Sequence, residues 1–170
     1  LLFTWVDDLM RHERILDAVE DLIGGDILCW NTFFWTKEAR TDTFVSWHQD
    51  LRYWGLDSGQ LVTVWLALWP ATPETGCMRV LPGSHQREML PHSDEYQEHN
   101  MLTRGQEVSV QVDETQAVAM PLQAGEFSIH NVRLAHASGP NHSADRRIGL
   151  SLHYMPTSTR QIVGEWDSAA

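Results

Sequence analysis

Two separate points of the sequence carry side chains that could together hold a metal ion. His48 and Asp50 lie two residues apart, and a second cluster of small and polar residues begins with His136 and is followed by Arg147. Two histidines and one carboxylate on one side of a metal form the facial triad of non-haem Fe(II) oxygenases, which leaves coordination positions open. An arginine can bind a carboxylate through two parallel hydrogen bonds. The pattern therefore predicts an iron enzyme with a dicarboxylate co-substrate.

The spacing of His48 and Asp50 constrains their local structure. In an extended segment, side chains two residues apart leave the same face of the strand. On a helix the same spacing would point them apart. A His-x-Asp pattern also occurs by chance, and taken alone a histidine and an aspartate in an exposed turn are the favoured interpretation. The metal hypothesis therefore depends on a third ligand from elsewhere in the chain.

Four later histidines are candidates for that third ligand. His136 lies among small residues, which leave room around a metal and its co-ligands. His130 has the same strand parity and is the second choice. His142 lies in a polar turn and is expected to be solvated, while His153 lies on the last predicted strand. A single histidine on a strand is more often structural than a ligand, so the case for His136 rests on its partners.

Arg147 is the partner that matters most. The turn over residues 139–145 is expected to fold the following strand back beside His136. Along that strand the residues of one face are polar or small, beginning with Arg147, and those of the other are apolar: Ile148, Leu150, Leu152 and Tyr154. The polar face either meets solvent or lines the cavity of a barrel, as the strands of small ligand-binding barrels do.

The remaining pattern predicts a mainly β fold. Residues Asp7–Ile23 show apolar residues at helical spacing, followed by Gly24-Gly25, which is typical of an amphipathic helix that covers a sheet. The predicted strands are 27–35, 43–47, 61–69, 77–81, 116–121, 126–131 and 146–155. Many short strands joined by Gly and Pro turns favour a sandwich or barrel with one or two helices outside, in one domain over residues 1–170.

Residues 84–115 form a long polar segment with little strand signal. Long irregular inserts in compact domains are usually functional loops. We expect this segment to lie over the mouth of a pocket, with a solvated loop as the alternative.

Composition narrows the class of partners. The 170 residues carry 12 basic and 23 acidic side chains, a formal net charge of −11. Such a chain repels phosphate backbones and anionic lipid, so we expect neither nucleic acid nor membrane as a partner. The longest apolar stretch is too short to span a bilayer, and no signal peptide is evident. Cys29 and Cys77 are expected to be reduced thiols in a cytoplasmic protein.

Six short motifs follow one another along the chain. They are His48-Gln49-Asp50, Trp65 within LVTVWLAL, Gly76-Cys77-Met78, Leu81-Pro82-Gly83-Ser84-His85, Gly125-Glu126, and the segment 136–141 (HASGPN) followed by Arg147. In this order the chain resembles the phytanoyl-CoA dioxygenase family of Fe(II)/2-oxoglutarate-dependent oxygenases over residues 27–155. The family's 2-oxoglutarate arginine lies eleven residues after its distal histidine, which selects Arg147 over Arg146.

The resemblance implies a double-stranded β-helix, or jelly-roll, with a cupin-like barrel. It implies Fe(II) held by His48, Asp50 and His136, and Arg147 on the distal carboxylate of 2-oxoglutarate. The other residues implied at the 2-oxoglutarate site are Ser138, Trp65 and Phe33. With O₂ as the third reactant, the implied activity is hydroxylation of a small organic substrate with release of succinate and CO₂. Family members usually carry a further N-terminal segment, and we expect part of it to be missing here.

Three further expectations concern the chemistry. The halogenating branch of the superfamily lacks the carboxylate ligand, so Asp50 favours hydroxylation. The alternatives are a cupin-like metalloprotein that acts without 2-oxoglutarate, and a non-catalytic or truncated member of the fold. Tyr53, Trp54 and Met78 are candidates for the substrate pocket, with core packing as the alternative for each.

Overall fold

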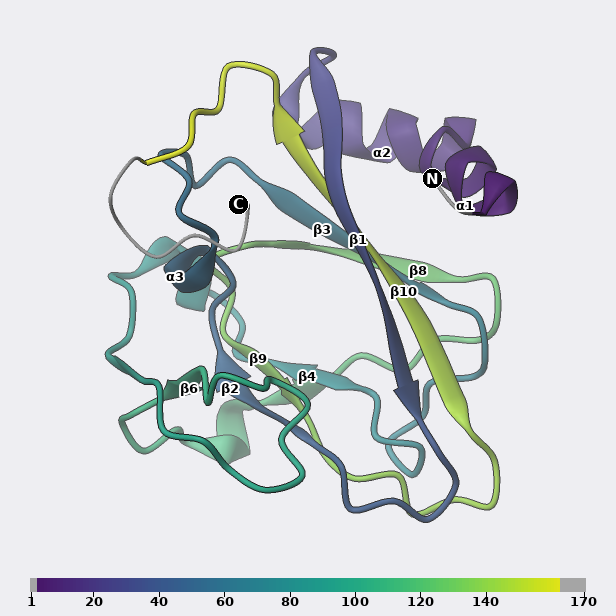
Figure 1. Cartoon of the computed structure of the whole chain (residues 1–170), viewed down its shortest axis with the longest axis vertical. Coiled ribbons are helices and arrows are strands. Elements are labelled where there is room, and N and C mark those ends of the chain that lie inside the picture. Colours follow the sequence, from purple (N-terminus) through teal and green to yellow (C-terminus); the bar gives the residue numbers. More distant parts are fainter. Residues whose placement is uncertain (1–2, 163–170) are drawn as a thin grey trace.

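Two antiparallel four-stranded sheets form the framework of the molecule (Figure 1). The computed structural model describes residues 3–162. One sheet has the strand order β1-β10-β3-β8, and the other has the order β2-β9-β4-β7. A separate pair, β5 and β6, completes the strands of this part of the chain. The two large sheets enclose a cavity lined from both sides, which is the jelly-roll arrangement predicted above.

The elements have the following bounds. The first sheet comprises β1 (Ile27–Lys37), β10 (Arg147–Pro156), β3 (Val62–Ala67) and β8 (Phe127–Asn131). The second comprises β2 (Val45–His48), β9 (His136–Ser138), β4 (Met78–Val80) and β7 (Val118–Ala119), and the small pair is β5 (His92–Ser93) and β6 (Glu107–Val108). The α-helices are α1 (Thr4–Met10), α2 (Glu13–Ile23) and α3 (Leu51–Trp54), with short 3₁₀ turns at Ser84–Gln86 and Glu114–Gln116.

The prediction of a single N-terminal helix over Asp7–Ile23 is wrong, because two helices, α1 and α2, occupy this region. The chain leaves helical geometry at His12, whose φ of −64° and ψ of 124° are extended. No Gly or Pro marks the break. The hydroxyl of Tyr154, on β10, donates a 2.9 Å hydrogen bond to the carbonyl of Met10 at the end of α1. A distant residue therefore satisfies a carbonyl that the helix end leaves unpaired.

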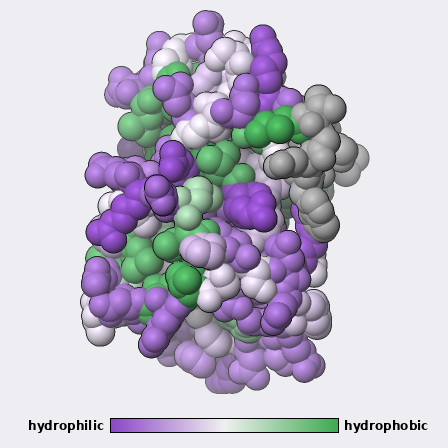
Figure 2. Space-filling model, turned by 90° about the vertical axis from the view of Figure 1, so that its left-hand side faces the viewer, coloured by the Kyte–Doolittle hydropathy of each residue, from purple (hydrophilic) through white to green (hydrophobic). Residues whose placement is uncertain are grey.

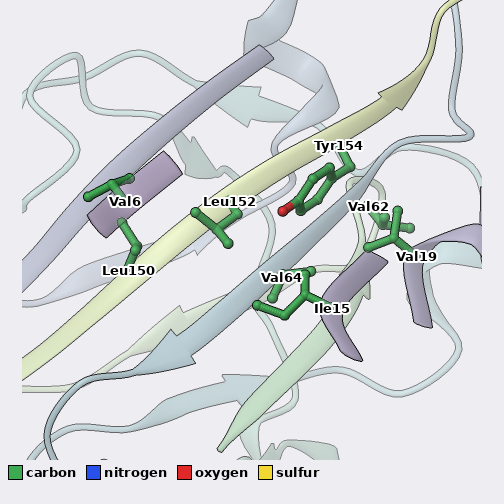
Figure 3. Close-up of a cluster of buried hydrophobic side chains, with 8 residues drawn as sticks. All are labelled: Val6, Ile15, Val19, Val62, Val64, Leu150, Leu152 and Tyr154. Atoms are coloured by element: carbon green, nitrogen blue, oxygen red, sulfur yellow. The ribbon is translucent and has the colours of Figure 1, made fainter. Parts of the chain in front are cut away.

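The two helices cover the outer face of the first sheet. Side chains from α1 and α2 pack against β3 and β10 in one buried cluster (Figure 3). Its members are Val6, Ile15, Val19, Val62, Val64, Leu150, Leu152 and Tyr154. The apolar face predicted for the last strand therefore meets the helices. On the opposite face Arg147, Ser151 and His153 line the cavity, which confirms the barrel interpretation of the polar face.

Some predicted strands are shorter than their sequence pattern. β7 contains only Val118–Ala119, against the predicted 116–121, because a 3₁₀ turn occupies Glu114–Gln116. β2 begins at Val45 and extends through His48. Neither α3 nor the β5–β6 pair was predicted. On the side of the molecule that carries α3 and β6, hydrophilic side chains surround a band of apolar ones (Figure 2).

Candidate metal centre

Pairing of β2 with β9 in the second sheet brings His48, Asp50 and His136 together. His48 ends β2, His136 begins β9, and the two residues are cross-strand partners. Their ring centroids lie 4.1 Å apart. Asp50 Oδ1 lies 3.3 Å from His48 Nε2 and 4.0 Å from His136 Nε2. One ligand atom from each of the three residues falls within 4.8 Å of the others, so one metal ion could contact all three.

The local geometry of Asp50 differs from the extended segment that we expected. Its φ of −54° and ψ of −44° are helical, and it stands immediately before α3. The turn is held by Gln49, which is fully buried. The Gln49 side chain donates to the carbonyl of Arg133 and accepts a 2.8 Å hydrogen bond from the amide of Leu90. These contacts turn the chain after β2, and the carboxylate remains beside His48.

The histidine rings are oriented as a metal site requires. His48 Nδ1 lies 2.9 Å from the carbonyl of Ser46, and His136 Nδ1 lies 2.9 Å from the carbonyl of Leu134. A carbonyl can only accept, so Nδ1 carries the proton in each ring. Nε2 is then left with a lone pair. Such backbone partners orient metal-ligating histidines in known sites, and these residues therefore fit a divalent metal.

Burial and mutual interaction keep two of the donors, His136 and Asp50, in their metal-binding protonation states. Burial lowers the pKa of His136 to about 3, so its ring is neutral at pH 7. Burial opposes ionisation of Asp50, but interactions with His136, His48 and His130 outweigh it. The pKa of the Asp50 carboxyl therefore lies below its usual range, and the group is an anion.

His130, the second choice for the third ligand, lies beside the triad. Its Nε2 is 3.9 Å from Asp50 Oδ2, and its ring centroid is 4.7 Å from that of His136. It does not belong to the group of donors that share one position. His142 is exposed, as expected, and His153 lines the cavity.

Acid is expected to destabilise the metal-free protein in a defined pH window. Burial lowers the pKa of His130 and of His153 to about 4, whereas an unfolded histidine titrates near 6.5. Between these values the unfolded chain binds protons that the folded protein does not. The free energy of unfolding should therefore fall as the pH is lowered from 6.5 to 4, by up to about 1.4 kcal/mol per pH unit for each histidine.

Urea unfolding with a chelator present, at several pH values, measures this slope. The variant His130→Gln should make the slope shallower, whereas His142→Gln at the exposed turn should leave it unchanged. An equal pH slope of the free energy of unfolding in the unaltered protein and in His130→Gln would contradict the lowered pKa of His130.

Two basic side chains are buried at the other end of the cavity: Arg147 lines it, and Lys37 contacts Ser138 in its wall. Arg147 is 3% exposed, and Lys37, its cross-strand partner on β1, is fully buried. Within residues 3–162 neither has a carboxylate partner. Burial, followed by the charge of Arg147, lowers the pKa of Lys37 to about 7. Buried charges are costly unless they are paired, so this end of the cavity is built for an anion.

Each basic side chain is held in place by neutral groups. Arg147 donates a 3.0 Å hydrogen bond from Nη2 to the carbonyl of Gly76, and its guanidinium lies 5.3 Å from the ring centroid of Trp65. Lys37 Nζ donates to Ser138 Oγ at 2.7 Å and also to the carbonyls of Ser138 and Gly139. The Arg147 Nε atom is buried and has no hydrogen-bond partner in this part of the chain.

The residues predicted at the co-substrate site separate into two groups. Trp65 and Ser138 line the inner cavity together with Arg147. Phe33 does not, because its side chain lies further out and is 47% exposed. Trp35, two residues along on the same face of β1, lines the inner cavity instead, and its Nε1 donates a 3.0 Å hydrogen bond to Ser151 Oγ.

Sequence reasoning missed Lys37 and Trp35. The signal was alternation, because Phe33, Trp35 and Lys37 share one face of β1. A lysine that ends an apolar strand on its inward face points to a cavity.

Two cavities adjoin the triad and share the lining residues Trp35, His48, Asp50 and His153. The inner cavity is lined by Trp35, Val45, His48, Asp50, Thr63, Trp65, Met78, His130, His136, Ala137, Ser138, Arg147, Ser151 and His153. The aromatic mouth, of about 400 Å³, is lined by Trp30, Asn31, Phe33, Phe34, Trp35, His48, Asp50, Tyr53, Trp54, residues 101–104, Gln106 and His153. Part of the 84–115 segment therefore lies over the mouth, as expected. Tyr53 and Trp54 line the mouth and also belong to a hydrophobic cluster, and Met78 lines the inner cavity.

The family model described as phytanoyl-CoA dioxygenase (PhyH) matches residues 4–149. The chain belongs to the phytanoyl-CoA dioxygenase family. A probable alpha-ketoglutarate-dependent hypophosphite dioxygenase of Stutzerimonas stutzeri is 28% identical over 165 residues, which cover 96% of this chain and 57% of that protein. The human peroxisomal phytanoyl-CoA dioxygenase is 26% identical, with 88% of this chain and 45% of that protein covered. The chain thus spans about half the length of the curated relatives it matches.

Solved structures agree with the fold. The apo form of ThoJ, a non-heme monooxygenase, is 38% identical, with a TM-score of 0.84 and coverage of 95% of this chain and 59% of that one. EvdO2 of Micromonospora carbonacea var. aurantiaca, complexed with 2-oxoglutarate, is 27% identical, with a TM-score of 0.74 and coverage of 98% and 68%. Within residues 3–162 of the present chain, no helix is long and apolar enough to cross a membrane.

Proposed function

We propose that this protein is an Fe(II)- and 2-oxoglutarate-dependent dioxygenase that hydroxylates a small organic substrate and releases succinate and CO₂. One observation carries the proposal. The His-Asp-His donor set and Arg147 line the same inner cavity, and Lys37 is bonded to Ser138 in its wall. A metal site alone would suit many reactions, whereas a metal site with an unpaired cationic end suits an anionic co-substrate.

The side chains have distinct tasks in this proposal. His48, Asp50 and His136 would hold the metal from one side, which leaves the side toward the inner cavity free. When bound, Fe(II) supplies the coupling of O₂ reduction to oxidative decarboxylation of 2-oxoglutarate. Arg147 would bind the far carboxylate through charge-assisted hydrogen bonds, and its contact with Trp65 fixes the guanidinium plane. The protein's own contribution is orientation and exclusion of side reactions.

Lys37 supports the same site from behind. Its ammonium group donates to Ser138, which ends β9, and to the carbonyl of Gly139, the residue after that strand. In its protonated form, Lys37 also raises the electrostatic potential at the Arg147 end of the inner cavity. Buried Arg147 disfavours the cupin-like alternative without 2-oxoglutarate, which would leave the guanidinium without a counter-ion.

An anaerobic titration tests the proposal. We expect no visible band from the protein with Fe(II), and a metal-to-ligand charge-transfer band after 2-oxoglutarate is added. Admission of O₂ should then give succinate. A matched sample of Asp50→Ala should give neither. Bound iron without a band would overturn the role of 2-oxoglutarate, and absence of bound iron would overturn the metal centre.

A cytoplasmic location is part of the proposal. Cys29 and Cys77 are both free thiols, which is the usual state in a reducing compartment.

A further inference from the structure

His153 lies where the inner cavity meets the aromatic mouth, because it lines both. Its side chain is 4% exposed. The imidazole is surrounded by aromatic rings, with centroid distances of 4.6 Å to Trp54, 5.8 Å to Phe33 and 6.1 Å to Trp30. His153 is not one of the metal donors and does not bind the co-substrate, so the proposed reaction assigns it no role.

One nitrogen of His153 is paired and the other is not. Nε2 lies 2.9 Å from Ser151 Oγ, which also accepts from Trp35. Nδ1 is buried and has no hydrogen-bond partner within residues 3–162. Burial lowers the pKa of His153 to about 4, so the ring is neutral at pH 7 and Nδ1 either donates or accepts. A buried polar atom without a partner calls for an explanation, and a ligand is one.

A second unpaired atom lies on the same wall. Trp30 Nε1 is buried and has no hydrogen-bond partner in the described residues. The Trp30 ring meets Trp54 edge to face at 5.1 Å and meets His153 at 6.1 Å. The wall thus combines an N–H donor with an imidazole nitrogen inside an aromatic surround. Tryptophan N–H groups usually find a partner when they are buried.

The rest of the aromatic mouth defines what could reach these atoms. Six aromatic side chains line it: Trp30, Phe33, Phe34, Trp35, Tyr53 and Trp54. Among the described residues, the charged side chains that line the mouth are Asp50, a proposed metal ligand, and Arg104. A volume of about 400 Å³ lies in the range of small-molecule sites. The lining therefore suits a flat apolar body with few charges.

We propose that the aromatic mouth binds a primary substrate with an apolar ring system that carries a hydroxyl group, and that His153 Nδ1 recognises this hydroxyl. A hydroxyl both donates and accepts, so it satisfies either tautomer of His153 and can also accept from Trp30. The aromatic side chains hold the ring system by offset or edge-to-face packing. His153 is then a specificity-determining residue at the boundary of the inner cavity. That the bound molecule is a substrate rests on the proposed function, whereas its binding to the aromatic mouth does not.

Binding of two matched probes to the metal-free protein tests the inference without turnover. The probes are 2-naphthol and naphthalene, which differ by one hydroxyl, and calorimetric titration gives both affinities. We expect the protein to prefer 2-naphthol by about five- to tenfold, the worth of one hydrogen bond. The variant His153→Gln keeps a polar group near Ser151 but loses the Nδ1 position, so the preference should fall to less than about twofold.

Two further variants make the result specific. His153→Asn places a polar atom near the Nδ1 position and should restore most of the preference, which a merely structural role would not do. His142→Gln, at an exposed turn, should leave both affinities unchanged. An undiminished preference in His153→Gln, or no binding of either probe by the unaltered protein, would overturn the inference. A missing charge-transfer band with an intact 2-naphthol preference would instead overturn the proposed reaction alone.

Discussion

Replacing His136 with alanine is expected to abolish metal binding by the protein. His136 supplies one of three donors that share a single position, and its Nε2 lone pair is directed by the hydrogen bond from Nδ1 to Leu134. Loss of an outer-shell partner alone costs roughly 10- to 100-fold in metal affinity. Loss of a ligand should therefore lower the Fe(II) affinity by more than about 100-fold. Anaerobic equilibrium dialysis followed by metal analysis measures the effect.

Two histidines provide matched controls for this experiment. His142→Ala, six residues away and exposed, should bind Fe(II) as the unaltered protein does. His130→Ala should also retain iron, since His130 contacts Asp50 but lies outside the donor group. If iron were lost in His130→Ala and kept in His136→Ala, the ligand assignment would pass to His130.

Replacing Arg147 with alanine should weaken binding of 2-oxoglutarate while Fe(II) still binds. Arg147 is buried and unpaired, so a bound carboxylate would be its counter-ion in a site of low dielectric. Truncating one partner of a buried, hydrogen-bonded charge pair costs about 2–5 kcal/mol. At 1.4 kcal/mol per tenfold, this corresponds to roughly a 30- to 4,000-fold higher dissociation constant. Titration of the charge-transfer band with 2-oxoglutarate gives this constant directly.

Arg146 is the matched control for Arg147. Its side chain is 54% exposed and pairs with Glu38 at 3.4 Å. Arg146→Ala should leave 2-oxoglutarate binding within about twofold, because exposed ion pairs contribute little. Equal affinity of the protein and Arg147→Ala would sink the assignment of the cationic end. Loss of iron in Arg147→Ala would show a general collapse of the inner cavity instead.

Periodicity in the sequence was sufficient to predict which side of β10 faces the cavity. Residues along a strand alternate between its two faces, and the apolar set of this strand had to be buried. Leu150, Leu152 and Tyr154 accordingly meet the helices, and Arg147 and His153 face inward. The family resemblance likewise pointed to three residues that converge in the structure, because the order and spacing of the motifs can be read along the chain.

Local pattern was insufficient where a distant contact decides the conformation. The break between α1 and α2 coincides with the hydrogen bond from Tyr154, which comes from the other end of the chain. The turn that presents Asp50 depends on Gln49, whose amide group bonds to Arg133 and Leu90. None of these partners is near in sequence. The predicted N-terminal helix therefore ran on past the break at His12, and the His48–Asp50 segment was predicted to be extended.

The residue types of the site, their spacing, and the alternation that separates core from cavity can be read along the chain, because they depend on side-chain chemistry and strand periodicity. Three features emerge only when the sheets assemble: Lys37 lies beside Arg147, Trp35 rather than Phe33 reaches the inner cavity, and His153 borders the aromatic mouth. Strand register explains all three. Pairing of β1 with β10 joins residues more than 100 positions apart, and burial then leaves their polar atoms without water.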